Sequence, residues 1–293
     1  MKKHFLVTVS FDSAHLTGVG FLCSFFQKLS EHQVTLLHIC RMDSQSMNAT
    51  LLETWENPED KLNGKLTVGA KQALEKARAM LSQSSMSVDQ IVTKTYAEQY
   101  GKVTDILSEA SKGLYDAIVL GKRASYTLQS FFERPGDETA KEIIRGKALS
   151  TPLWICPEPE EGRRNVLVCV DGSKNALRAV DHVGYILSKQ PQHSITLFNA
   201  QSGTGRDADV IFQEAKAELY EHGISDDRIH TATSWGLSIP ATIMNFAEKG
   251  SFAAIAFGLH GVKEGLLKSI NLSGGTAGKL IEKTNKISLW CCP

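Results

Sequence analysis

The second half of this 293-residue chain repeats its first half. Both halves end on nearly the same five residues, which read LWICP at 153–157 and LWCCP at 289–293. An apolar run before each ending also recurs, as DAIVLG at 116–121 and AAIAFG at 253–258. The chain is therefore expected to contain one fold twice, so that a candidate site in one copy can be compared with the same place in the other.

Length and charge narrow the classes of protein to consider. The chain is long for a single core and suits two domains, 1–157 and 164–293, joined by a polar, proline-containing linker. Its formal net charge of +0 argues against nucleic acid or an anionic membrane as a partner. The apolar runs are too short to cross a bilayer, and the N-terminus lacks the apolar centre of a signal peptide. We therefore expect a cytoplasmic protein without a membrane partner.

Each half alternates short β-branched runs with longer helical patterns, which predicts an α/β fold built on parallel sheets. Strands are expected at 4–10, 33–40, 89–96, 115–120 and 152–156, and again at 165–170, 194–200, 228–234, 252–257 and 287–292. Helices are expected at about 64–83, 173–189, 207–222, 237–249 and 276–285. Residues 41–62 are an insertion of the first half, which we interpret as a surface loop.

In a doubly wound sheet, ligands bind at the carboxyl ends of the strands, where the winding reverses direction. In the second half, Asp171-Gly172 follows the first strand, Gly258 to Gly261 follow the fourth, and Gly274 to Thr276 open the last helix. A carboxylate accepts hydrogen bonds from an adenine amino group or a ribose hydroxyl. Glycines let the backbone approach a ligand, and the amide groups at a helix start favour phosphate. These residue types favour nucleotide chemistry.

The residues Val170 to Ser173, the Gly258-x-x-Gly261 pair and Gly275-Thr276 resemble those of universal stress proteins, and the whole chain resembles the tandem members of that family. The resemblance implies two doubly wound domains, each a five-stranded parallel sheet of order 3-2-1-4-5 flanked by helices. It also implies ATP, with or without magnesium, as a ligand. The nucleotide-binding residues would be Asp171, Gly172, Gly258, His260, Gly261, Gly274, Gly275 and Thr276.

The second half departs from the family pattern Gly-x2-Gly-x9-Gly-Ser/Thr in one respect. Thirteen residues, not nine, separate Gly261 from Gly275. Two interpretations stay open: the longer loop holds a nucleotide, or the glycines only make turns. The role of His260 also stays open, since its side chain either contacts the ligand or faces solvent.

The first half departs further from the pattern. Asp12 aligns with Asp171 and Gly121 with Gly258, but Ala124 replaces the second glycine. Asp137-Glu138 stands where Gly274-Gly275 stands in the other copy. Two carboxylates near a helix start suit the helix dipole but repel a polyphosphate. We therefore predict that the first half is a degenerate domain without ATP.

Several other patterns are discounted. The run 274–279 resembles a P-loop, but its spacing is one residue short and Leu280 replaces the hydroxyl residue. No GxSxG motif and no metal-ligand spacing of histidines is present, and His38 is expected to be a core residue. The six cysteines form no CxxC pair and are expected to be reduced, with Cys291-Cys292 packing on opposite faces of a strand. Trp154 and Trp290 either dock the two halves as an internal pseudo-dimer or fill the core.

Together with these residues, the resemblance implies a stress-response protein that acts as an adenine-nucleotide-responsive binding or signalling module, with ATP in the second half. Its partner would be an unknown protein, and a homodimer would be compatible with the fold. The alternatives are a nucleotide-independent scaffold and, with less support, a slow ATPase. No general base can be placed from the sequence, so we assign no catalytic residue and no metal ligand.

Overall fold

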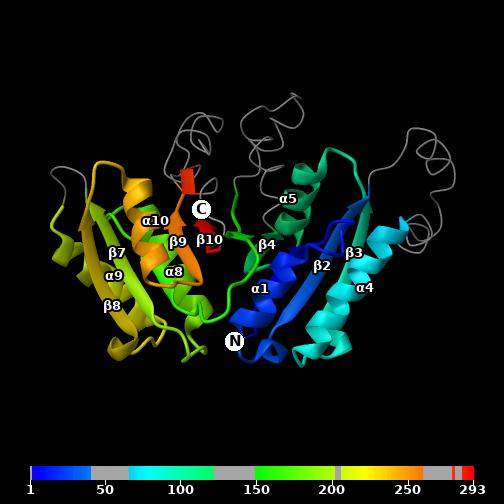
Figure 1. The fold of residues 1–293 in the computed structure, drawn as a ribbon, viewed down its shortest axis with the longest axis horizontal. Coiled ribbons are helices and arrows are strands. Elements are labelled where there is room, and N and C mark those ends of the chain that lie inside the picture. The colour runs from blue at the N-terminus through cyan, green and yellow to red at the C-terminus, as the bar shows by residue number, and fades with distance from the viewer. Residues whose placement is uncertain (1, 41–65, 122–148, 202–205, 260–278, 281–285) are drawn as a thin grey trace.

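The computed structural model describes residues 2–40, 66–121, 149–201, 206–259, 279–280 and 286–293 (Figure 1). Within them, ten strands form one sheet with helices on both faces. The insertion at 41–62 and most of the helix expected at 276–285 lie outside the described residues. None of the described helices is long and apolar enough to cross a membrane.

The sheet has the strand order β3-β2-β1-β4-β5-β10-β9-β6-β7-β8. The strands are β1 His4–Thr8, β2 Gln33–Cys40, β3 Ile91–Ala97, β4 Ala117–Gly121, β5 Leu153–Cys156, β6 Val166–Cys169, β7 Ile195–Gln201, β8 Ile229–Trp235, β9 Ala254–Gly258 and β10 Ser288–Cys292. Neighbours are parallel except β5 and β10, which pair antiparallel. The order 3-2-1-4-5 expected for each half is confirmed, and the antiparallel pair joins the two halves into one sheet.

Helices cover the sheet in two layers, as the doubly wound fold requires. One face packs against α1 (Thr17–Phe25), α4 (Val68–Gln83), α8 (Lys174–Leu187) and α9 (Ala208–Glu221). The other face packs against α5 (Lys102–Lys112) and α10 (Ile239–Lys249). Short 3-10 helices, η1 Leu29–Glu31, η2 Val88–Gln90 and η3 Asp226–Arg228, precede β2, β3 and β8.

Alternating side chains of the central strands supply the two cores. Phe5 and Val7 of β1 point into the layer with α1 and α4, whereas Leu6 points into the layer with α5. Hydroxyl caps set the helix starts: the Thr67 side chain accepts from the Ala70 amide at 3.2 Å, so α4 begins at Val68 and not at 64 as expected. Strand alternation thus divides the apolar side chains between two cores, and a local side-chain hydrogen bond sets where α4 begins.

Strand pairing fixes which residues of the two halves are equivalent. Val7 pairs with Val119 in the first half, and Val168 pairs with Ala256 in the second. Two residues further along, the Val9 amide donates to the carbonyl of Leu37 and the Val170 amide donates to that of Phe198, both at 2.9 Å. Residues 9 and 170 are therefore equivalent, and neighbouring positions follow by counting.

The halves meet at a pair of stacked tryptophans. Trp154 of β5 lies opposite Trp290 of β10, with ring centroids 3.9 Å apart and planes within 2° of parallel. Both side chains are fully buried. Trp154 Nε1 donates to His182 Nε2 at 3.0 Å, whereas Trp290 faces the Phe25 ring, and its Nε1 finds no acceptor among the described residues. The tryptophans thus both join the halves and fill the core, the two roles that the sequence left open.

Candidate functional site

The candidate site of the second half lies where β6 and β9 end. The chain leaves β6 toward β7 on one side, and β9 lies on the other side, so the winding reverses between these two strands. Asp171 and Gly172 directly follow β6, and Gly258 ends β9. The structure therefore places these three predicted residues at the switch point where ligands bind in this class of sheet.

Asp171 shapes the loop that leads into α8. Its Oδ1 accepts a hydrogen bond from the Ser173 amide at 2.9 Å, and the Ser173 hydroxyl oxygen in turn accepts from the Ala176 amide at 3.1 Å. Asp171 is exposed, and no described residue donates to its Oδ2. One carboxylate oxygen thus holds the turn, while the other remains available to a ligand.

Arg206 is a residue of this site that the sequence reasoning missed. Its Nη1 donates to the carbonyl of Gly172 at 2.9 Å, and its Nη2 pairs with Glu214 at 2.7 Å. Gly172 has a φ of +78°, and a Cβ there would lie 2.5 Å from Arg206 Nη1, so glycine suits both the backbone and the contact. A half-exposed guanidinium at this position could pair with a phosphate. Only the position of Arg206 soon after β7 could have drawn attention to it.

Gly258 has a structural task that neither sequence interpretation included. A Cβ at this position would lie 2.1 Å from the carbonyl oxygen of Asn175 in the first turn of α8. The equivalent Gly121 likewise lies against α1, where a Cβ would be 2.9 Å from Thr17 Oγ1. Glycine therefore ends β4 and β9 because it lets a helix start approach the strand closely. A ligand at this strand end would lie beside the first turn of α8.

The remaining predicted residues, His260, Gly261, Gly274, Gly275 and Thr276, lie outside the described residues. So do Ala124, Asp137 and Glu138, on which the degenerate reading of the first half rests. Whether these positions surround a ligand stays a prediction.

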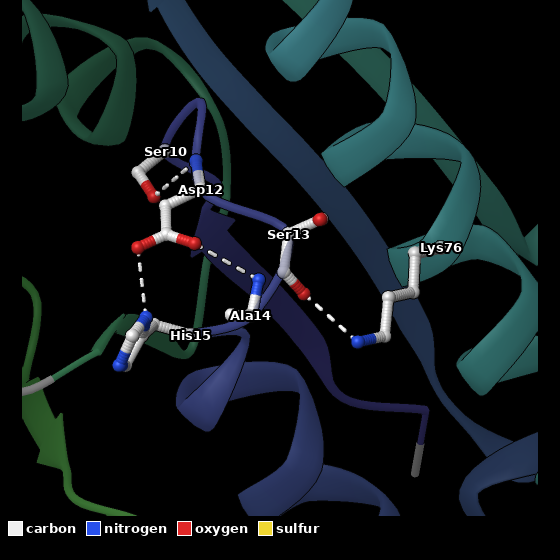
Figure 2. A network of polar contacts seen from close by, with 6 residues as sticks. All are labelled: Ser10, Asp12, Ser13, Ala14, His15 and Lys76. Atoms are coloured by element: carbon white, nitrogen blue, oxygen red, sulfur yellow. Dashed lines mark hydrogen bonds and ion pairs between the residues drawn. The ribbon is translucent and has the colours of Figure 1, made fainter.

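The loop after β1 in the first half is built differently (Figure 2). Asp12 Oδ1 accepts from the Ala14 amide at 3.0 Å, and Oδ2 lies 2.7 Å from His15 Nδ1. Ser10 Oγ accepts from the Asp12 amide at 3.2 Å, and Lys76 Nζ donates to the carbonyl of Ser13 at 2.9 Å. Both carboxylate oxygens of Asp12 are thus engaged within the first half.

The alignment of Asp12 with Asp171 is wrong. Counting from Val9 and Val170 makes Ser10 the residue equivalent to Asp171. The local contacts do not distinguish the two candidates, because Ser10 and Asp12 both accept from the amide two residues later, as Asp171 does. Residues 9–16 connect β1 to α1, whereas 170–173 suffice between β6 and α8, and this longer connection misled the alignment.

Buried polar groups close to both loops are satisfied within the core. His38 Nδ1 donates to the carbonyl of Val9 at 2.8 Å, as the equivalent Asn199 Nδ2 donates to that of Val170 at 2.7 Å. His38 is buried, and burial lowers its pKa, so its expected core role is confirmed. Burial, with the charge of Asp171, raises the pKa of Cys169 to about 12, which disfavours the thiolate form that a nucleophile needs.

All six cysteines are free of disulfides, as expected. Cys291 packs into the layer with α10 and Cys292 into the opposite layer, so the prediction that this pair packs on two faces of a strand is confirmed. Within the described residues, one group has three potential metal ligands close together: Asp181 of α8, Glu218 of α9, and His222 directly after α9. It lies on helices and not at the strand ends.

Comparison of the whole structure with solved structures finds a similar architecture. A Pseudomonas aeruginosa protein described as a universal stress protein matches 99% of this chain and 93% of its own length, at 13% identity and a TM-score of 0.52. The chain has the universal stress protein fold. A universal stress protein in complex with cAMP matches 44% of this chain and 96% of its own, at 21% identity and a TM-score of 0.36. One from Archaeoglobus fulgidus matches 44% and 93%, at 19% identity and a TM-score of 0.28.

The sequence comparisons add no relative. No model of a protein family matches the chain, and no curated protein matches it. The comparisons therefore show only that this chain has the architecture of universal stress proteins. Its ligand has to be argued from the residues of this chain.

Proposed function

We propose that this protein is a stress-response binding module that takes an adenine nucleotide, ATP in the first instance, in its second half. One observation carries the proposal: at the switch point between β6 and β9, no described residue donates to Asp171 Oδ2, and the Arg206 guanidinium binds the neighbouring Gly172. In the first half, the loop at the equivalent place uses its carboxylate internally. The two copies of one fold thus differ in the group that a nucleoside would need.

Each residue has a distinct part in the proposal. Asp171 would accept hydrogen bonds from the adenine amino group or the ribose hydroxyls, and Gly172 and Gly258 would let the ligand approach the backbone. The loop residues His260 and Gly261 and the helix start Gly274-Gly275-Thr276 would hold the phosphates, with Arg206 and a magnesium ion offsetting their charge. Binding would be read by a protein partner in the cytoplasm.

A nucleotide-independent scaffold is the second candidate, and an exposed apolar surface favours it. Trp235 ends the edge strand β8 with its side chain largely exposed, and Leu237 is 94% exposed two residues later. Large exposed apolar side chains at a sheet edge suit contact with another protein. This surface would serve a partner whether or not a nucleotide is bound, and it would serve equally in a homodimer.

A calorimetric titration with ATP and magnesium tests the proposal, together with chromatography of any nucleotide released from purified protein. Asp171→Ala should weaken ATP binding at least roughly tenfold, because the lost hydrogen bonds involve a charged acceptor. The matched control is Asp12→Ala, which removes the carboxylate of the first half and should leave the affinity unchanged. Wild-type protein that neither carries nor binds a nucleotide would sink the proposal in favour of the scaffold. Product formation that disappears in Asp171→Ala would instead support an ATPase.

A further inference from the structure

A cavity of about 330 Å³ opens between α1 and the segment that links the two halves. Its walls include Phe21 and Phe25 of α1, residues 159–164 of the linker, Ala253 and Lys286. Ala253 precedes β9 and Ser288 begins β10, so the cavity lies at the amino ends of these strands. The Asp171 loop follows the carboxyl end of β6, so the two places are at opposite edges of the sheet.

The equivalent place on the other side of the tryptophan stack is filled by side chains. There, α8 of the second half lies against the first half, and the Tyr185 hydroxyl donates to Asp116 Oδ1 at 2.8 Å. Lys3 Nζ lies 3.0 Å from the centroid of the Tyr185 ring. An aromatic ring, a carboxylate and a cation thus occupy this seam, which we call the α8 seam (Lys3, Asp116 and Tyr185).

In the seam that holds the cavity, which we call the α1 seam, these groups are absent or replaced. The amide of Asp116 donates to the carbonyl of His4, and the amide of Ala253 donates to that of Asn165, so Ala253 is equivalent to Asp116. The same count makes Arg164 equivalent to Lys3. The carboxylate of Asp116 therefore has no counterpart at residue 253, whereas the cation of Lys3 is replaced by that of Arg164.

The helix residue equivalent to Tyr185 is too small to fill its place. Phe21 of α1 lies edge-on to both tryptophans, as His182 of α8 does, so these two helix residues are equivalent. Three residues further along each helix, α8 carries Tyr185 and α1 carries Ser24, which lines the cavity. The short Ser24 side chain therefore leaves the space of the ring open.

Three basic and two acidic side chains line the cavity, so its wall carries a net positive charge: Arg163, Arg164 and Lys286 against Glu160 and Glu161. Arg163 and Lys286 share a single carboxylate, that of Glu160, at 2.6 and 2.9 Å. The Arg164 side chain forms no ion pair with any described residue. The opposite wall presents the rings of Phe21 and Phe25. Basic groups facing aromatic walls suit a ligand with a planar apolar body and an acidic end.

From these observations we infer that the α1 seam binds a small aromatic carboxylate. The ring of the ligand takes the space that Tyr185 fills in the α8 seam, and its carboxylate takes the place of Asp116, facing Arg164. The volume is at the lower end of the roughly 300–1,000 Å³ typical of ligand pockets, which limits the ligand to a small molecule. The site is separate from the proposed nucleotide site and does not depend on it.

Calorimetric titration of the full chain with 4-hydroxybenzoate tests the inference. We expect saturable binding of one molecule per chain, with phenol and acetate each binding at least roughly tenfold more weakly, because each offers only the ring or only the charge. Ala253→Asp copies the α8 seam and places a carboxylate where the ligand carboxylate lies. It should abolish binding. Ser24→Phe, which fills the cavity from α1, should do the same if it folds, as checked by circular dichroism.

Two controls separate this site from others. Lys189→Gln removes a positive charge near Lys3 in the α8 seam and should leave the affinity for 4-hydroxybenzoate unchanged. Asp171→Ala, aimed at the nucleotide site, should also leave it unchanged. The inference is overturned if wild-type protein shows no saturable binding at millimolar ligand, or if folded Ala253→Asp and Ser24→Phe bind as tightly as wild type. Equal binding of acetate would likewise overturn it, since the ring would then contribute nothing.

Discussion

The two halves share one fold but distribute polar groups differently through it. In the second half, Asp171 Oδ2 has no donor within the part of the chain that the structure describes, whereas both oxygens of Asp12 in the first half bind within its loop. In the helix layer formed by α5 and α10, the polar groups belong instead to the first half. The layer between the sheet and α5 holds a buried ion pair, and the equivalent layer under α10 is aromatic. Equivalent backbones can thus carry opposite chemistry, because the fold fixes positions and the side chains decide what each position does.

The tryptophan stack offers the largest test of this comparison. Replacing either indole by alanine should cost about 3–5 kcal/mol of unfolding free energy, because both are fully buried. Trp154→Ala should cost about 1–3 kcal/mol more than Trp290→Ala, since it also leaves the buried His182 acceptor without its donor. Urea denaturation monitored by circular dichroism measures both values.

The same pair can be tested more gently with phenylalanine. Trp290→Phe removes a buried indole N–H that has no acceptor among the described residues. It should therefore be the milder of the two replacements. Trp154→Phe breaks the bond to His182 and should be the more harmful one. Equal losses from the two variants would show that the contrast between His182 and its counterpart Phe21 has no consequence for stability.

The buried ion pair of the first half is the second test. Glu109 is buried and bonded to Lys94 Nζ at 2.6 Å and to the Tyr115 hydroxyl at 2.9 Å. Burial alone would raise the pKa of Glu109, but these hydrogen bonds outweigh it and hold the pKa below its usual value. Glu109→Gln should cost about 3 kcal/mol, at the lower end for a broken buried pair because Lys94 is partly exposed.

Replacing the whole cluster by its second-half equivalents is the control for that loss. Ala232, Phe246 and Phe252 occupy the places of Lys94, Glu109 and Tyr115. The triple variant Lys94→Ala, Glu109→Phe, Tyr115→Phe should therefore recover most of the stability lost in Glu109→Gln, because a well-packed apolar cluster often equals a buried ion pair. A triple variant less stable than Glu109→Gln would mean that the two layers are not interchangeable. Thermal unfolding ranks the variants.

Features that depend on the local sequence pattern could be predicted. Features that depend on contacts between distant residues could not. Strand β2 was placed at its observed bounds, since an apolar run between polar residues marks its ends. The strand order followed from a resemblance carried by short motifs. The match of Asp12 to Asp171 failed because the length of a connection is invisible until strand pairing is known. Arg206 and the α8 seam were missed because their contacts join residues far apart in the chain.

Lys3 provides the smallest and most selective test, because it separates the two seams by pH. Its ammonium is buried over the Tyr185 ring, and Nζ finds no hydrogen-bond acceptor among the described residues. Burial lowers the pKa of Lys3 to about 8, against the attraction of Asp116 and with a further lowering by Lys189. The unfolded chain therefore binds more protons than the folded one between pH 8 and 10.5, and stability should rise with pH in that window.

Between pH 7 and about 9.5, this group should add about 2 kcal/mol to the unfolding free energy, at roughly 1.4 kcal/mol for each pH unit above 8. Lys3→Met should remove that increase, as measured by urea denaturation at the two pH values. Arg164→Met, at the equivalent place in the α1 seam, should leave the increase intact, because Arg164 is exposed. A wild-type increase that survives in Lys3→Met would assign the pH dependence to another group and would remove the main electrostatic difference between the two seams.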